Sequence, residues 1–128
     1  MSLRKNQSIF ALNISKLIIY AYESGYEITL GEAYRTKSQQ YLYFEGYNII
    51  KLGSDLKLAK TDPKSKTMFS KHLKKLALDI NVFKDGRLLD KNDKELFKPL
   101  AEYWKSLNPN NTCGYYWGWD YNHFQMSA

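Results

Sequence analysis

The stretch 76-LALDINV-82 determines the predicted fold, because polar and apolar side chains alternate along it. One face of the expected strand carries the apolar residues Leu78, Ile80 and Val82. Asp79 and Asn81 lie on the other face. A period of two over this length is typical of a strand with one buried face. The sequence therefore predicts that Asp79 points away from the core.

Upstream of this strand, the sequence predicts a helix, a strand, a shorter helix and a loop. Apolar residues recur at spacings of three and four over 8–24, which indicates an amphipathic helix. Residues 26–30 alternate like a half-buried strand, and Arg35 is expected at its end. Ser38 is the expected cap of a short helix that ends at Gly46. Segment 48–69 shows little periodicity, so we expect a long loop there.

Downstream, residues 84-KDGR-87 predict a hairpin turn. Residues 91–106 again show helical spacing of apolar side chains and are followed by Asn108 and Pro109. A final aromatic segment, 115–126, completes the pattern. We therefore expect an α+β fold, a small single domain over residues 1–128 with an antiparallel sheet flanked by helices.

Composition narrows the function only broadly. Nineteen Lys and Arg against 13 Asp and Glu give a net charge of +6, which attracts polyanions such as nucleic acid, anionic lipid or an acidic cell-wall polymer. The single Cys113 excludes an internal disulfide. No apolar stretch is long enough to span a bilayer. Polar residues interrupt the apolar run 9–22, so we expect synthesis in the cytoplasm without a recognisable signal peptide.

The only two histidines each lie near an aspartate. His72 precedes Asp79 by seven residues, and His123 follows Asp120 by three. A catalytic zinc ion takes three protein ligands of these residue types, and a carboxylate outside the metal shell can act as general base. Taken alone, the same residues also suit a hydrogen-bonded core histidine and a turn-capping aspartate, so both interpretations stay open at this point.

Two motifs carry a family resemblance. Residues 70–79 form the pattern SxHxxxxAxD, and residues 120–124 form DxxHF, with Arg35 upstream. Together they resemble the M15 metallopeptidases, a family that contains D-alanyl-D-alanine carboxypeptidases and phage L-alanyl-D-glutamate endopeptidases. The resemblance extends from Gly31 to Met126 and implies a hedgehog-like or DD-peptidase-like fold with a zinc site in a cleft.

The resemblance also implies residue roles. His72, Asp79 and His123 are expected to bind Zn²⁺, and Asp120 is expected to act as general base and then general acid. Arg35 is expected to contact the substrate and the developing oxyanion. Ser70 is expected to contact the substrate or support the ligands. Arg35 as a surface ion-pair partner of a nearby glutamate, and Ser70 as a turn residue, are the alternatives.

Two features depart from the family pattern. Many relatives have Gly at the position of Lys75; if a positive φ is required there, Lys costs about 1 kcal/mol. The segment 115–119 is short and aromatic, so the pocket wall on that side differs. Gln39 and Gln40 align with polar residues that follow the family arginine, but solvent-facing positions on the short helix are equally compatible.

The family members suggest where the enzyme acts. An Asp base instead of the Glu of the dipeptidase branch, with no export signal, favours a phage or prophage endolysin-type L-alanyl-D-glutamate endopeptidase. It would cut the stem peptide of peptidoglycan at the bacterial cell wall as a monomer, after release by a holin-type partner. The alternatives are a D-alanyl-D-alanine carboxypeptidase, a fold in which zinc is only structural and, more remotely, a basic nucleic-acid-binding domain; nucleic acid is not an expected partner.

Overall fold

The computed structural model describes residues 2–127 and confirms the expected α+β class. Its helices are α1 (Leu3–Glu23), α2 (Lys37–Glu45) and α3 (Lys94–Leu107), with short 3₁₀ helices η1 (Lys71–Lys74) and η2 (Gly114–Trp117). Its strands are β1 (Tyr26–Leu30), β2 (Tyr47–Leu52), β3 (Asp55–Lys60), β4 (Ala77–Lys84), β5 (Arg87–Leu88), β6 (Asn111–Cys113) and β7 (His123–Met126). No helix within residues 2–127 combines the length and apolar character needed to cross a membrane.

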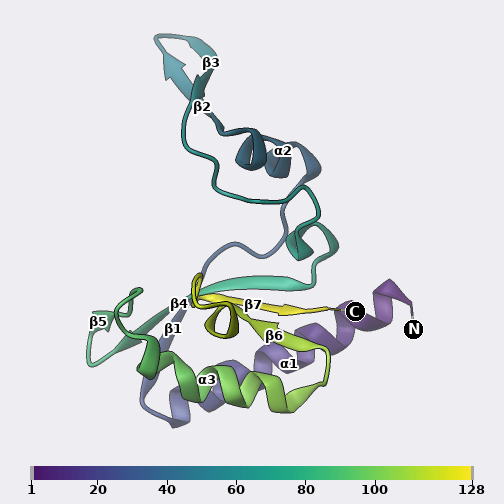
Figure 1. Ribbon diagram of the computed structural model, residues 1–128, viewed down its shortest axis with the longest axis vertical. Helices are drawn as coiled ribbons and strands as arrows, with labels where there is room; N and C mark the ends of the chain where they lie inside the picture. The colour runs from purple at the N-terminus through teal and green to yellow at the C-terminus, as the bar shows by residue number, and fades with distance from the viewer. Residues whose placement is uncertain (1, 128) are drawn as a thin grey trace.

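The predicted strand β4 is the centre of the main sheet. The strand order is β1-β4-β7-β6, β5 pairs with the end of β4, and every pairing is antiparallel. Helices α1 and α3 cover one side of this sheet, whereas α2 and the β2–β3 hairpin lie on the other side (Figure 1). The sheet therefore separates a helix-covered core from the side on which Asp79 lies.

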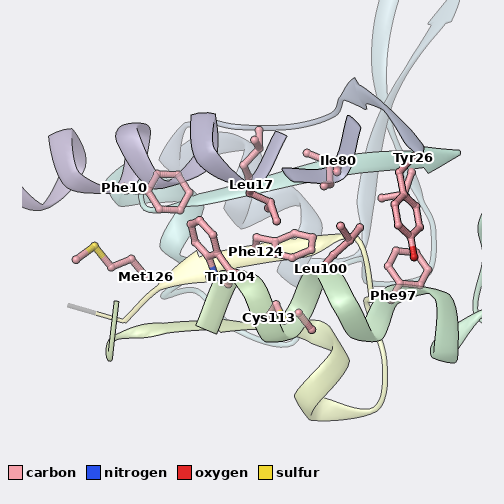
Figure 2. Packing of buried hydrophobic residues seen from close by; sticks show 14 of the residues in the cluster. Phe10, Leu17, Tyr26, Ile80, Phe97, Leu100, Trp104, Cys113, Phe124 and Met126 are labelled. Carbon is pink, nitrogen blue, oxygen red and sulfur yellow. The ribbon is translucent and has the colours of Figure 1, made fainter. Parts of the chain in front are cut away.

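The core lies between the sheet and the helices α1 and α3 (Figure 2). Trp104 of α3 is fully buried, and its ring meets Phe10 of α1 at 5.6 Å and Phe124 of β7 at 5.9 Å, both edge to face. Its indole N–H donates to the backbone oxygens of Thr112 and Gln125. The side chains Leu78, Ile80 and Val82 are buried on this face, as predicted. Trp104 thereby ties α3 to strands β6 and β7 through both packing and hydrogen bonds.

The helix boundaries differ from the predicted ones. Helix α1 begins at Leu3 instead of residue 8, because the Ser2 hydroxyl accepts a hydrogen bond from the Lys5 N–H and caps it. Thr36, and not Ser38, caps α2. Helix α3 begins at Lys94 instead of residue 91, since residues 90–93 form a turn closed by a hydrogen bond from the Asp93 N–H to the Asp90 oxygen.

The prediction of a long loop over 48–69 was wrong for its first half. Strands β2 and β3 form a hairpin around Gly53 and Ser54, with Gly53 at φ 62°. Every residue of β2 is exposed, and Ala59 of β3 is only partly covered. Because neither face packs on the core, the hairpin needs no alternating pattern, and this explains the missing periodicity. The chain from 61 to 70 is irregular, as expected.

The turn at 84–87 was predicted correctly. Asp85 and Gly86 have φ values of 53° and 77°, which are typical of a type I′ hairpin turn. The C-terminal part contains two strands that were not predicted, β6 and β7, which pair with each other. At three residues, β6 is too short to show a period in the sequence.

Lys75 adopts the left-handed conformation that its position in the family suggested. It ends η1 at φ 58° and ψ 36°, and its N–H donates to the His72 carbonyl. This left-handed residue turns the chain from η1 back into β4 within two residues. A side chain with a Cβ therefore occupies a conformation that glycine adopts without steric cost.

We expect Lys75→Gly to raise the free energy of unfolding by about 1 kcal/mol, because it relieves the left-handed conformation. Lys74→Gly is the matched control, and it should lower stability by about 0.5–1 kcal/mol because Lys74 lies inside η1 with ordinary φ. Urea denaturation of both variants measures the difference. Equal destabilisation by the two glycines would contradict the left-handed assignment.

Candidate metal centre

The pairing of β4 with β7 places Asp79 directly opposite His123. Residues that face each other across an antiparallel pair project from the same side of the sheet. Since Leu78 is buried in the core, Asp79 and His123 project from the opposite side. The His123 Nδ1 lies 3.0 Å from the Asp79 Oδ1.

His72 reaches the same carboxylate from η1. Its Nε2 lies 3.4 Å from the Asp79 Oδ1, and its ring meets the His123 ring edge to face, with centroids 5.0 Å apart. The two histidines are 2% and 7% exposed, respectively. The segment after β1 secures this arrangement through two backbone hydrogen bonds. The Gly31 N–H donates to the Asp79 carbonyl oxygen, and the Arg35 N–H donates to the His72 carbonyl oxygen. Backbone contacts therefore hold Asp79 and His72 in place, and the pairing of β4 with β7 holds His123.

Each imidazole is oriented by an acceptor on its far side. The His72 Nδ1 lies 2.8 Å from the Ala33 carbonyl oxygen, so Nδ1 carries the hydrogen and Nε2 keeps a lone pair. The His123 Nε2 lies 2.8 Å from the Gln125 Oε1, while the Gln125 amide nitrogen donates to the Ser127 hydroxyl. In the neutral tautomer with its hydrogen on Nε2, His123 donates to Gln125 and keeps a lone pair on Nδ1. The two lone pairs belong to different ring nitrogens, and both face Asp79.

This donor set fits a metal ion. One ligand atom each from His72, Asp79 and His123 lies within 4.8 Å of the other two. With neutral imidazoles, three acceptor atoms face one another with no hydrogen between them, and only a cation or an additional proton relieves their repulsion. Two imidazoles and one carboxylate are also a ligand set of catalytic zinc sites, which keep one further position open. The three predicted ligands therefore form a group that can hold a metal.

The same contacts shift the pKa values of Asp79 and His123. Burial disfavours the ionised Asp79, but the hydrogen bonds and charges that His123 and His72 contribute when protonated outweigh it and hold the pKa of this carboxyl below its usual range. Burial lowers the pKa of His123, but the hydrogen bonds to Asp79 and Gln125 outweigh that effect, so its pKa is raised. Without a metal, a proton on His123 thus stabilises the same carboxylate.

All six predicted site residues line one cleft of about 390 Å³. They are Arg35, Ser70, His72, Asp79, Asp120 and His123. The aromatic segment supplies one wall, where the Trp117 ring lies 5.4 Å from the His123 ring. Trp119 forms the rim with Lys66, whose ammonium lies 4.7 Å from the indole centroid. The cleft therefore has a basic and an aromatic border around the candidate metal centre.

Asp120 lies beside the three-residue group and outside it. Its Oδ2 is 3.9 Å from the His123 Nδ1. Burial raises the pKa of its carboxyl; the charge of His123 opposes this rise, whereas that of Asp79 adds to it. The backbone of Asp120 is left-handed at φ 57°. Its carbonyl packs so closely on Gly114 that a Cβ there would lie 1.8 Å from the oxygen. Gly114 is thus required for the position of Asp120, and sequence reasoning missed it.

Arg35 is not at the end of a strand, since β1 ends five residues earlier. Its Nε pairs with Glu32, so the alternative of an ion pair is confirmed, but the side chain is only 10% exposed and lines the cleft. Its Nη1 donates to the Gln40 Oε1 at 2.6 Å and to the Ser70 Oγ at 3.4 Å. Within residues 2–127, Nη2 makes no hydrogen bond. Protein contacts therefore hold Nε and Nη1 of the guanidinium, whereas Nη2 can bind a ligand.

Ser70 and Gln40 have supporting contacts. The Ser70 hydroxyl caps η1 by accepting from the His72 N–H at 3.2 Å, so the turn interpretation of Ser70 is confirmed alongside its contact with Arg35. Gln40 is completely buried, and its amide nitrogen donates to the Ser65 hydroxyl. Its spacing of five from Arg35 was the available signal for this role. Gln125 was also missed, although its spacing of two from His123 places it on the same strand face.

The single cysteine, Cys113, is not a reactive nucleophile. Cys113 is buried, and burial raises the pKa of its thiol to about 11, so the thiol stays protonated at neutral pH.

We expect zinc to reverse the pH dependence of stability above about pH 6.5, the ordinary pKa of histidine. Since the folded pKa of His123 is raised, its pairing with Asp79 stabilises the zinc-free protein at low pH and is lost as the pH rises through that pKa. Zinc requires deprotonated ligands, so the zinc-loaded protein should gain stability over the same range. Thermal unfolding with zinc and with chelator measures both slopes.

His123→Gln is the control for that measurement, because it removes the titrating imidazole and should flatten the zinc-free slope. Identical pH slopes with zinc and with chelator would contradict metal binding at these residues.

Comparison with known proteins agrees with this geometry. A family model of M15 peptidases, described as D-alanyl-D-alanine carboxypeptidase, matches residues 63–126. The matched segment contains His72, Asp79, Asp120 and His123, whereas Arg35 lies before it. No curated protein matches the sequence. Because the match spans half of the 128 residues, the chain belongs to this family of M15 peptidases.

Proposed function

We propose that this chain is a zinc-dependent peptidase that hydrolyses peptide bonds in bacterial peptidoglycan. His72, Asp79 and His123 are the proposed zinc ligands. We also propose that residues 1–128 act as one M15-like domain, because Arg35, which lines the cleft, and Gln40, which holds Arg35, come from the part of the chain before the family match. The observation that carries the proposal is the convergence of one nitrogen of each imidazole on one carboxylate, with Asp120 and Arg35 lining the same cleft.

Asp120 is the proposed proton carrier. When bound, zinc supplies a Lewis acid that polarises the scissile carbonyl and makes water acidic. Asp120 takes the proton of the attacking water on a carboxylate oxygen and then gives it to the leaving amine. Burial raises the pKa of Asp120, which brings its proton affinity closer to that needed for both transfers at neutral pH.

Arg35 is the proposed donor to the developing oxyanion. A positive group stabilises that charge best when its position is set before the reaction. The contacts with Glu32, Gln40 and Ser70 hold the guanidinium in place, and the face of the Tyr43 ring lies 4.8 Å away. The Nη2 group is left to bind substrate. Ser70 thus contributes mainly by orienting Arg35.

The charges of the cleft favour an acidic peptide. Lys64, Lys66 and Lys71 line it together with Arg35, and the whole chain has a net charge of +6. A peptidoglycan stem peptide bears free carboxylates that such a border attracts. This agreement supports the bacterial cell wall as the place of action.

A second cavity supports cleavage within a chain. It has a volume of about 590 Å³ and shares Trp119 and Asp120 with the first cleft. Because both cavities border Asp120, we propose that the substrate extends from one into the other, as an endopeptidase requires. We favour a phage or prophage endolysin-type L-alanyl-D-glutamate endopeptidase, monomeric and released by a holin-type partner, over a D-alanyl-D-alanine carboxypeptidase.

Digestion of purified peptidoglycan, followed by mass analysis, tests this function. We expect the zinc-loaded protein to release stem peptides cut between L-alanine and D-glutamate, and a chelator to stop the release. Free D-alanine as the sole product would identify the carboxypeptidase instead. Digestion that continues after complete removal of zinc would refute the proposed chemistry.

Asp120→Asn should lower kcat/KM about 10²–10⁴-fold with little change in zinc affinity, because the amide cannot carry the proton and Asp120 lies outside the ligand group. Initial rates on a soluble stem peptide and a zinc competition assay measure the two effects. Asp55→Asn, on the exposed strand β3 and outside both cavities, is the matched control and should retain the wild-type rate within about threefold. An unchanged rate in Asp120→Asn would assign the proton transfers to another group.

A further inference from the structure

Gln125 lies on β7 between the metal centre and the end of the chain. It pairs with Ala77 of β4 and Thr112 of β6, so the backbone holds it on both sides. Along β7, the side chains of Phe124 and Met126 are buried in the core. Gln125 therefore shares the opposite face with His123, and it lines the cleft.

We propose that Gln125 is a positioning residue that fixes the tautomer of His123 and so presents Nδ1 to the metal. The inference rests on the proposed function, since it assigns a task within the same site. The contact that carries it is the 2.8 Å hydrogen bond from the His123 Nε2 to the Gln125 Oε1.

Two acceptors compete for the single hydrogen of the neutral His123 ring. The Asp79 Oδ1 lies 3.0 Å from Nδ1, and the Gln125 Oε1 lies 2.8 Å from Nε2. A hydrogen on Nδ1 would bond to Asp79 and remove the lone pair that a metal needs. Gln125 opposes this outcome by offering an acceptor to Nε2. The acceptor for His123 is a side chain, which a substitution can remove, whereas the acceptor for His72 is the backbone carbonyl of Ala33.

The Gln125 amide oxygen faces His123, and its nitrogen lies 3.0 Å from the Ser127 hydroxyl, which accepts the hydrogen bond in this orientation. A flipped amide would direct an N–H donor at Nε2 and favour the opposite tautomer. The amide oxygen of Gln125 is thus the group on which the proposed tautomer of His123 depends.

Zinc affinity of two variants tests the inference. Gln125→Met removes the acceptor at similar volume, and we expect its zinc affinity to fall about 10–100-fold. Gln125→Glu keeps an acceptor at the same place, so its affinity should equal or exceed that of the wild type. Gln39→Met, on α2, is the matched control and should bind zinc like the wild type. Competition with a chromophoric chelator at one fixed pH gives each affinity.

The outcomes separate this inference from the function on which it rests. Equal zinc affinity in the wild type and Gln125→Met would overturn the role of Gln125 alone, and so would an equal loss in the Glu and Met variants. A wild-type protein that binds no zinc would overturn the proposed function and this inference together.

A second measurement does not depend on affinity. In the zinc-loaded wild type, long-range ¹H–¹⁵N spectra of the imidazoles should show the hydrogen of His123 on Nε2 and that of His72 on Nδ1. A hydrogen on the His123 Nδ1 would contradict the inference. In Gln125→Met, the metal-free midpoint of unfolding should stay within about 2 °C of the wild type, which separates loss of positioning from loss of folding.

Discussion

The cross-strand pair of Asp79 and His123 is the contact on which the site depends. It exists because β7 pairs with β4 in a single register, and a shift of β7 by one residue would turn His123 into the core. That register is secured from the other face, where Phe124 of β7 packs against Trp104. The same strand pairing therefore supports the hydrophobic core on one face of the sheet and the metal centre on the other.

With neutral imidazoles, the centre of the site holds only hydrogen-bond acceptors: one nitrogen lone pair each from His72 and His123, and the Asp79 carboxylate. The Ala33 carbonyl and the Gln125 amide oxygen favour this state, because each accepts the hydrogen of one imidazole on its far side. The arrangement is costly without a cation and favourable with one. Arg35 and Asp120 then add a fixed positive donor and a proton acceptor beside the same point. As a member of the M15 peptidases, the chain combines these features in a cleft bordered by lysines.

The sequence predicted correctly those elements whose signal lies within a few neighbouring residues. The strand around Asp79 was predictable from its alternating polar and apolar residues, and the turn at Asp85 and Gly86 from residue types that adopt a positive φ. The β2–β3 hairpin was missed because it has no buried face, although Gly53 and Ser54 offered a turn signal. Gly114 and Gln125 could not be predicted, since their roles depend on close approach and hydrogen bonds between segments. At Arg35 the residue was predictable, whereas its contacts with Gln40 and Ser70 depend on the tertiary fold.

Zinc binding at equilibrium tests the central claim most directly. Isothermal titration of the metal-free protein should give one zinc ion per chain, and His72→Ala, Asp79→Ala and His123→Ala should each abolish this binding while the far-ultraviolet circular dichroism stays unchanged. Stoichiometric zinc binding that survives all three substitutions would contradict the account, as would a folded wild-type protein that binds no zinc.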